Sequence, residues 1–70
     1  MQILVFKTNL TDTDHINAIG STLNVHPDIY KWNVDLHDCD KILRIVANNI
    51  APYTVEAMLT NAGYYCEELQ

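Results

Sequence analysis

Residues 10–16, Leu-Thr-Asp-Thr-Asp-His-Ile, lie where an apolar strand pattern changes into a helical one. Before this stretch, residues 3–6 are four consecutive apolar side chains, which are typical of a strand inside a sheet. After it, apolar or small residues recur at the i, i+3, i+4, i+7 spacing of a helix that buries one side, namely Ile16, Ile19, Gly20 and Leu23. The pattern therefore predicts a strand over residues 2–8 and a helix over residues 13–24.

The same stretch has two interpretations. Asp and Thr before a helix are ordinary cap residues, because their side-chain oxygens accept hydrogen bonds from the unpaired N–H groups of the first turn. However, Asp12 also stands three residues before His15, so a carboxylate and an imidazole are close enough to bind a metal ion together. Such ligands suit Zn(II), Cu(II) or Ni(II), and a complete site would need His37, Cys39 or a partner's side chain as well.

The middle of the chain reads as a β-hairpin over residues 29–47. Pro27 follows the first helix and disfavours helical geometry at the residue before it. Trp32, Val34 and Leu36 then alternate with polar residues, as in a strand with one solvated face. The polar residues 38–40 form the expected turn, and residues 41–47 form a second apolar strand.

A second helix and a last strand complete the pattern. Pro52 suits the first turn of a helix, where its missing N–H costs nothing, and Gly63 suits the residue after the helix end. Between them, apolar residues repeat the helical spacing at Val55, Met58, Leu59 and Ala62. Residues 64–69 are the predicted final strand.

The resulting order, β-α-β-β-α-β, predicts an α+β fold of the ferredoxin-like type. This sandwich has a four-stranded antiparallel sheet with two helices on one face, and residues 1–70 form one domain. Its topology brings three loops to one end, where we expect the following side chains to gather: Asp12, Asp14, His15, His37, Asp38, Cys39, Asp40 and Tyr64. The other sheet face has no helix, and either Leu4 and Phe6 or Ile3 and Val5 must point toward it.

Composition and charge limit the classes of partner and the cellular location that we expect. The 70 residues include nine acidic and four basic side chains, a formal net charge of −5, which disfavours binding to nucleic acid. No apolar run is long enough to span a membrane, and no signal for secretion is visible. Two cysteines without a Cys-x-x-Cys motif suggest reduced thiols, so we expect a cytoplasmic protein.

The chain resembles the heavy-metal-associated domain of copper chaperones and metal-pumping ATPases. That family has a strand, a Gly-Met-Thr-Cys-x-x-Cys loop, a helix, a Pro-Gly-Val turn, an alternating strand and a late Gly-Tyr. In this chain Leu10-Thr11 stands at the Met-Thr of the loop, and Ile19 and Leu23 stand at the apolar pair of the first helix. Pro27-Asp28-Ile29 matches the turn, and residues 32–36 match the alternating strand. Val55, Leu59 and Gly63-Tyr64 match the closing helix and the loop after it. Asp12 and His15 occupy the two cysteine positions, so the thiolate pair that selects Cu(I) is replaced by harder ligands.

These observations lead to three hypotheses. The first is a non-catalytic interaction module that binds a protein partner, or forms a homodimer, through the open sheet face. The alternative is binding or transfer of a divalent metal through Asp12, His15 and either His37 or Cys39. The third, a small ligand-binding regulatory domain, rests on analogy of fold alone. No nucleophile arrangement is visible, so we predict that the chain is not an enzyme.

Overall fold

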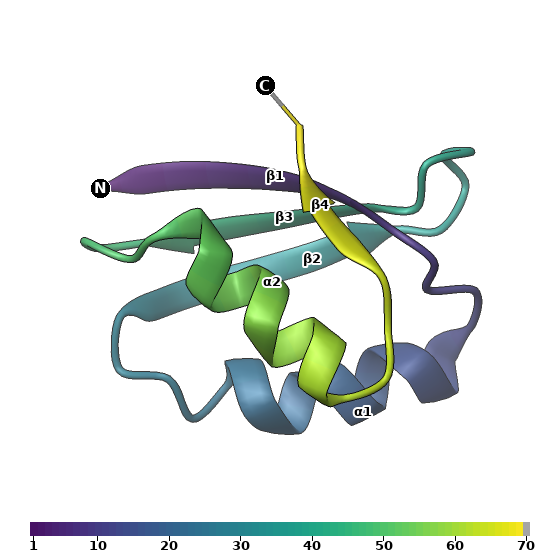
Figure 1. The fold of residues 1–70 in the computed structure, drawn as a ribbon, viewed down its shortest axis with the longest axis horizontal. Coiled ribbons are helices and arrows are strands. Elements are labelled where there is room, and N and C mark those ends of the chain that lie inside the picture. The colour runs from purple at the N-terminus through teal and green to yellow at the C-terminus, as the bar shows by residue number, and fades with distance from the viewer. Residues whose placement is uncertain (70) are drawn as a thin grey trace.

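The computed structural model describes residues 1–69, which form four strands and two helices (Figure 1). In chain order the elements are β1 (Gln2–Thr8), α1 (Thr13–Leu23), β2 (Ile29–Asp35), β3 (Ile42–Ala47), α2 (Pro52–Asn61) and β4 (Cys66–Glu68). The strands make one sheet in the order β2-β3-β1-β4, and every neighbouring pair is antiparallel. Both helices lie on the same side of this sheet (Figure 1), which confirms the ferredoxin-like prediction.

The helices and the last strand differ slightly from the predicted bounds. Helix α1 ends at Leu23 because Asn24 already acts as its C-terminal cap, donating its N–H to the Gly20 carbonyl. Strand β4 is shorter than predicted because the N–H of Tyr65 is bound by the Asn9 side chain, so strand pairing begins at Cys66. None of the described helices is long and apolar enough to cross a membrane.

The hydrophobic core lies between the sheet and the two helices. Phe6, Leu43 and Ile45 line the helix-facing side of the sheet and are fully buried. Ile19 and Leu23 of α1 and Val55 and Leu59 of α2 close the core from below. Leu10 is also fully buried, so the loop between β1 and α1 is attached to the same core.

The register decides which side chains face away from the helices. Leu4, Phe6 and Thr8 are buried, while Ile3 and Lys7 are exposed, so the odd-numbered residues of β1 point to the open side of the sheet. From the sequence, either Leu4 and Phe6 or Ile3 and Val5 could point away from the helices. In the structure it is Ile3 and Val5 that do so.

Candidate functional site

Three loops meet at one end of the molecule, as predicted; we call this end the loop pole, made of residues 9–12, 36–41 and 62–65. The N–H of Thr8 donates to the Asp40 carbonyl at 3.0 Å, and the Thr8 hydroxyl donates to the Lys41 carbonyl. The N–H of Tyr65 donates to Asn9 Oδ1 at 2.9 Å. These bonds hold the first loop against both of the others.

Asp12 is the N-cap of helix α1. Its backbone is extended and its Oδ1 accepts a hydrogen bond from the N–H of His15 at 3.1 Å. Asp14 lies in the first turn, where a negative charge is favoured by the helix dipole. Capping, the first of the two interpretations of this stretch, is therefore confirmed for Asp12.

The His15 imidazole bonds back to the loop that precedes the helix. Its Nδ1 accepts the N–H of Thr11 at 3.1 Å, which places the proton of the neutral ring on Nε2. That Nε2 lies 4.0 Å from Asp12 Oδ1. A metal ion at His15 would have to displace either the Thr11 hydrogen bond or the Nε2 proton.

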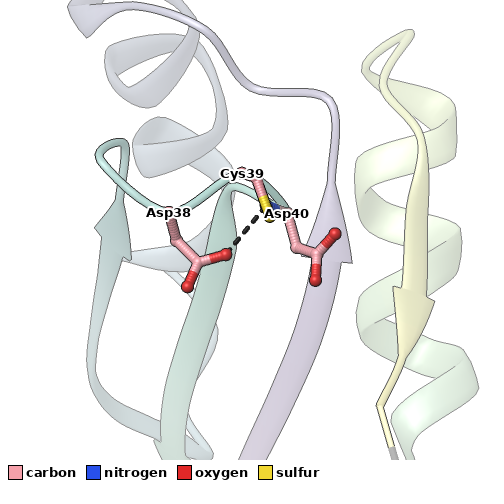
Figure 2. Close-up of side chains that lie close together, drawn as sticks. All are labelled: Asp38, Cys39 and Asp40. Atoms are coloured by element: carbon pink, nitrogen blue, oxygen red, sulfur yellow. Dashed lines mark hydrogen bonds between the residues drawn. The ribbon is translucent and has the colours of Figure 1, made fainter.

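The hairpin turn between β2 and β3 brings Asp38, Cys39 and Asp40 together (Figure 2). One ligand atom from each lies within 4.8 Å of the others, and this is the one such group of three or more acidic, cysteine or histidine side chains within residues 1–69. The turn is shaped by the Asp40 N–H, which donates to Asp38 Oδ1 at 2.8 Å (Figure 2). Cys39 is exposed and its thiol is free.

The predicted metal ligands are therefore brought together only in part. Asp12 and His15 are neighbours, and Cys39 lies between two carboxylates, but Asp12, His15 and His37 are outside the Asp38-Cys39-Asp40 group. The N–H of His37 instead donates to Asp35 Oδ1 at 3.0 Å. Asp38 and Asp40 were not among the predicted metal ligands, although the Asp-Cys-Asp spacing in a predicted turn was a usable signal.

The side of the sheet opposite the helices is the second candidate surface, here called the open sheet face. Strand alternation and register place the following residues on it: Ile3, Val5, Lys7, Lys31, Asn33, Asp35, Ile42, Arg44, Val46, Tyr65, Glu67 and Leu69. Ile3 is 68% exposed and stands directly opposite the half-buried Val46. An apolar strip thus crosses the two central strands in contact with water.

Charge is distributed unevenly between this face and the rest of the molecule. The open sheet face carries Lys7, Lys31 and Arg44, which are three of the chain's four basic residues, but only Asp35 and Glu67 of its nine acidic ones. The face thus lacks the acidic excess of a protein whose net charge is −5, although Lys7 Nζ lies 3.9 Å from Asp40 Oδ1 of the loop pole and is paired there. The loop pole is acidic by comparison.

Two groups in or beside β4 have shifted acid–base properties. Burial raises the pKa of the Cys66 thiol to about 12, with a further contribution from the nearby Glu56 carboxylate. Cys66 packs against the core, as expected for a small apolar residue. The hydroxyl of Tyr65 donates to Glu67 Oε2 at 2.7 Å, and this bond is the main reason that the pKa of Tyr65 is raised.

Comparison with known proteins gives matches in structure only. No protein-family model and no curated protein sequence matches the chain. The copper transporter domain Ccc2a from yeast, solved in apo and Cu(I)-loaded states, superimposes with a TM-score of 0.86 at 15% identity, over 100% of this chain and 97% of Ccc2a. The copper-binding domain of HMA7, a P-type ATPase, gives a TM-score of 0.85 at 16% identity, over 100% and 96%.

A third match has the same extent. A structure of the Atx1-Cu(I)-Ccc2a complex contains a chain that superimposes with a TM-score of 0.86 at 15% identity, over 100% of this chain and 97% of that one. The likeness spans the whole chain, while the identity is too low to carry more than the fold. The chain therefore has the fold of the heavy-metal-associated domains of copper transporters.

Proposed function

We propose that this chain is a non-catalytic binding module whose open sheet face docks a partner protein with an apolar centre and an acidic surround. The observation that carries this proposal is the pairing of the exposed Ile3 with the half-buried Val46, which are flanked by basic side chains on a single face. An apolar patch on a soluble surface that is bordered by charge is typical of a protein interaction site.

The apolar part of the docking surface lies across the two central strands and β4. Ile3 is opposite Val46, and Val5 lies beside Leu69, whose N–H donates to the Val5 carbonyl at 2.9 Å. Burying such side chains contributes roughly 25 cal/mol for each Å² of apolar surface removed from water. The strip is thus the part of the face that gains most from being covered.

The basic side chains of the open sheet face favour a partner whose contacting surface is negatively charged. Arg44 stands between Val5 and Asn33 in the register, and Lys31 stands opposite Val46, so both cations border the apolar strip. A partner with carboxylates around an apolar centre would meet these cations. Complementary charges of this kind speed association and exclude surfaces of the wrong sign.

Other features agree with a role in binding instead of catalysis. No enclosed pocket is present among residues 1–69, so these residues offer no cleft that would exclude water from a reaction. The structural match in the Atx1-Cu(I)-Ccc2a complex shows this fold in an assembly with another protein.

Free Cys39 and Cys66 suit a reducing compartment, and we place the protein in the cytoplasm.

The test compares partners captured by the immobilised wild-type chain, Ile3→Glu and Arg44→Glu, with Tyr53→Ala as the matched control. Tyr53 is as exposed as Ile3 but lies on α2, on the opposite side of the molecule. We expect a partner that is retained by wild type and Tyr53→Ala and lost by both sheet variants. The purified partner should then bind with an affinity that falls with salt. If the partner is lost by Tyr53→Ala and retained by both sheet variants, the docking site lies on the helices and the proposal is contradicted.

A second candidate function is binding of Zn(II), Cu(II) or Ni(II) at the loop pole. It is favoured by the short distance between Asp12 and His15 and by the Asp38-Cys39-Asp40 group. His37 or Cys39 would complete the first set only if the hairpin turn moved toward helix α1. This function is the weaker candidate because His15 Nδ1 already accepts the N–H of Thr11 and Asp12 Oδ1 already accepts the N–H of His15.

Calorimetric titration of the reduced protein tests the metal hypothesis directly. Zn(II), Cu(II), Ni(II) and Cu(I) would be titrated into wild type, Asp12→Ala, His15→Ala and Cys39→Ser. Binding at roughly micromolar affinity or better that is lost in His15→Ala would establish a site at the first loop. Loss in Cys39→Ser alone would place the site in the hairpin turn, and absence of binding by wild type would remove this function for the isolated chain.

A further inference from the structure

Strand β2 forms one outer edge of the sheet. It pairs with β3 on one side only, because the sheet order is β2-β3-β1-β4. A bulge interrupts the pairing between Ile29 and Lys31, and the regular part of the strand then runs from Lys31 to Asp35. An edge strand of this kind presents unpaired N–H and C=O groups that can pair with another chain.

The ladder shows which backbone groups of β2 face outward. The Val5 carbonyl accepts from Leu69 and therefore faces β4, so Val5 and its partner Arg44 form a non-hydrogen-bonded pair. The backbone groups of Arg44 consequently face β2, where Arg44 is opposite Asn33. The backbone groups of Asn33 are used by β3, and those of its neighbours Trp32 and Val34 point to the free edge.

The outward edge of β2 can pair with the same edge of a second copy of the chain. When two copies of β2 are placed antiparallel about a two-fold axis at Asn33, Trp32 of one copy meets Val34 of the other, and their outward backbone groups form hydrogen-bonded pairs. In the same register Lys31 stands opposite Asp35 of the second copy, and Asp35 opposite Lys31. These opposite charges fall in non-hydrogen-bonded pairs, where facing side chains are closest.

Only this register pairs opposite charges directly. An axis at Trp32 places Lys31 opposite Asn33, and an axis at Val34 places Asn33 opposite Asp35. An axis at Lys31 or at Asp35 brings like charges together, which is destabilising across a strand pair. The side-chain order of β2 thus selects one symmetric arrangement.

We propose that two copies of this chain associate through their β2 edges and form one continuous eight-stranded sheet centred on Asn33. The side chains of Trp32 and Val34 face the core side but are only half-buried, because no strand lies beyond them. A second copy would cover both. The indole is already held in place by its Nε1–H, which donates to Asn24 Oδ1 at 2.8 Å.

This dimer is independent of the docking proposed above. Edge pairing leaves the open sheet face uncovered and joins two such faces side by side. A protein partner can therefore be absent while the dimer forms, and the dimer can be absent while a partner binds. The two proposals are tested by different variants.

Sedimentation equilibrium over roughly 1 µM to 1 mM protein tests the dimer. Lys31→Glu makes the facing positions all acidic, and Asp35→Lys makes them all basic, so each variant alone should dimerise about tenfold or more weakly than wild type. An equimolar mixture should form a heterodimer, because an acidic side chain of one variant then meets a Lys of the other at both positions. The double variant Lys31→Glu/Asp35→Lys should again form a homodimer.

Lys7→Glu is the matched charge-reversal control, since Lys7 is exposed on the same open sheet face but lies on β1, with β3 between it and the β2 edge. It should leave the dimerisation constant unchanged. Circular dichroism would verify that every variant folds, which is expected because Lys31 and Asp35 are both exposed. A monomeric wild type up to the highest concentration would overturn the proposal. So would a dimer that is lost in Lys7→Glu and kept in Lys31→Glu, or a mixture that stays monomeric.

Discussion

The imidazole ring of His15 lies against the phenol ring of Tyr64, with ring centroids 5.1 Å apart and planes tilted by 51°. His15 belongs to the first turn of α1, and Tyr64 follows α2, so the contact joins the beginning of one helix to the end of the other. It fixes the third loop of the loop pole against the first.

This contact should be measurable as a coupling free energy. Aromatic pairs contribute about 0.5–1.5 kcal/mol beyond the area that they bury. We expect Tyr64→Leu to lower the free energy of unfolding in urea by about that amount, and a smaller effect when His15 is already Ala. If the two substitutions are additive to within about 0.3 kcal/mol, the rings do not stabilise each other.

Replacing Asp12 tests its role as a cap. Asp12→Ala removes the acceptor of the His15 N–H and should cost about 1 kcal/mol of the free energy of unfolding. Asp12→Asn keeps a side-chain oxygen at the same place and should cost much less. Thermal or urea unfolding of both variants provides the measurement, and equal losses would show that the charge, and not the hydrogen bond, matters.

Gly20 is a position where helix propensity and packing oppose each other. Alanine is favoured over glycine in a helix by about 1 kcal/mol. A Cβ at this position, however, would lie 3.0 Å from Trp32 Cζ2, and the indole is held by its bond to Asn24. We expect Gly20→Ala to be destabilising overall by about 1 kcal/mol.

The same substitution made together with Asn24→Ala should be less harmful, because the indole is then free to move away. Trp32 fluorescence would report the displacement in both backgrounds. An increase in stability of Gly20→Ala alone would mean that the ring yields easily and that propensity decides the outcome.

The two thiols should differ in reactivity. The thiolate is the reactive form, and raising the pKa of Cys66 from 9.0 to about 12 reduces its thiolate fraction near neutral pH by about a thousandfold. Cys39 is exposed and free. Alkylation followed by mass spectrometry should therefore label Cys39 first, and labelling of Cys66 should require unfolding.

Cys66 also predicts how stability changes in alkaline solution. Well below pH 9 the thiol is protonated in both the native and the unfolded chain, so it adds no pH dependence there. Between pH 9 and about 12 the unfolded chain loses this proton while the native one keeps it, so the free energy of unfolding falls as pH rises. Cys66→Ala should show a shallower fall than Cys39→Ser over this range.

Most of the fold could be predicted from local patterns. The alternation of Trp32, Val34 and Leu36 and the placement of Pro52 and Gly63 each depend on near neighbours in the chain, and each predicted element was found. Local patterns could not predict which alternate side chains of β1 face the helices. Four consecutive apolar residues give no alternation, and the choice is made by β3, whose Leu43 and Ile45 lie opposite Phe6 and Leu4.

The candidate site was less predictable than the fold. Topology was enough to expect the loop pole, because it depends only on strand order. The hydrogen bonds of Asp12 with the His15 N–H and of the His15 ring with Thr11 depend on side-chain rotamers and on which ring nitrogen carries the proton, and neither can be obtained from spacing. The metal ligands Asp12, His15, His37 and Cys39 therefore remain a prediction.

The pairing of β1 also sets the order of events in folding. Both neighbours of β1 come from the second half of the chain, since Gln2 pairs with Ala47 and Thr8 with Cys66. During synthesis this apolar strand must therefore wait, without a partner, until β3 has left the ribosome. The folding rate should be limited by this long-range closure, and Ile3 and Val5 are exposed to chaperones and to other nascent chains throughout the delay.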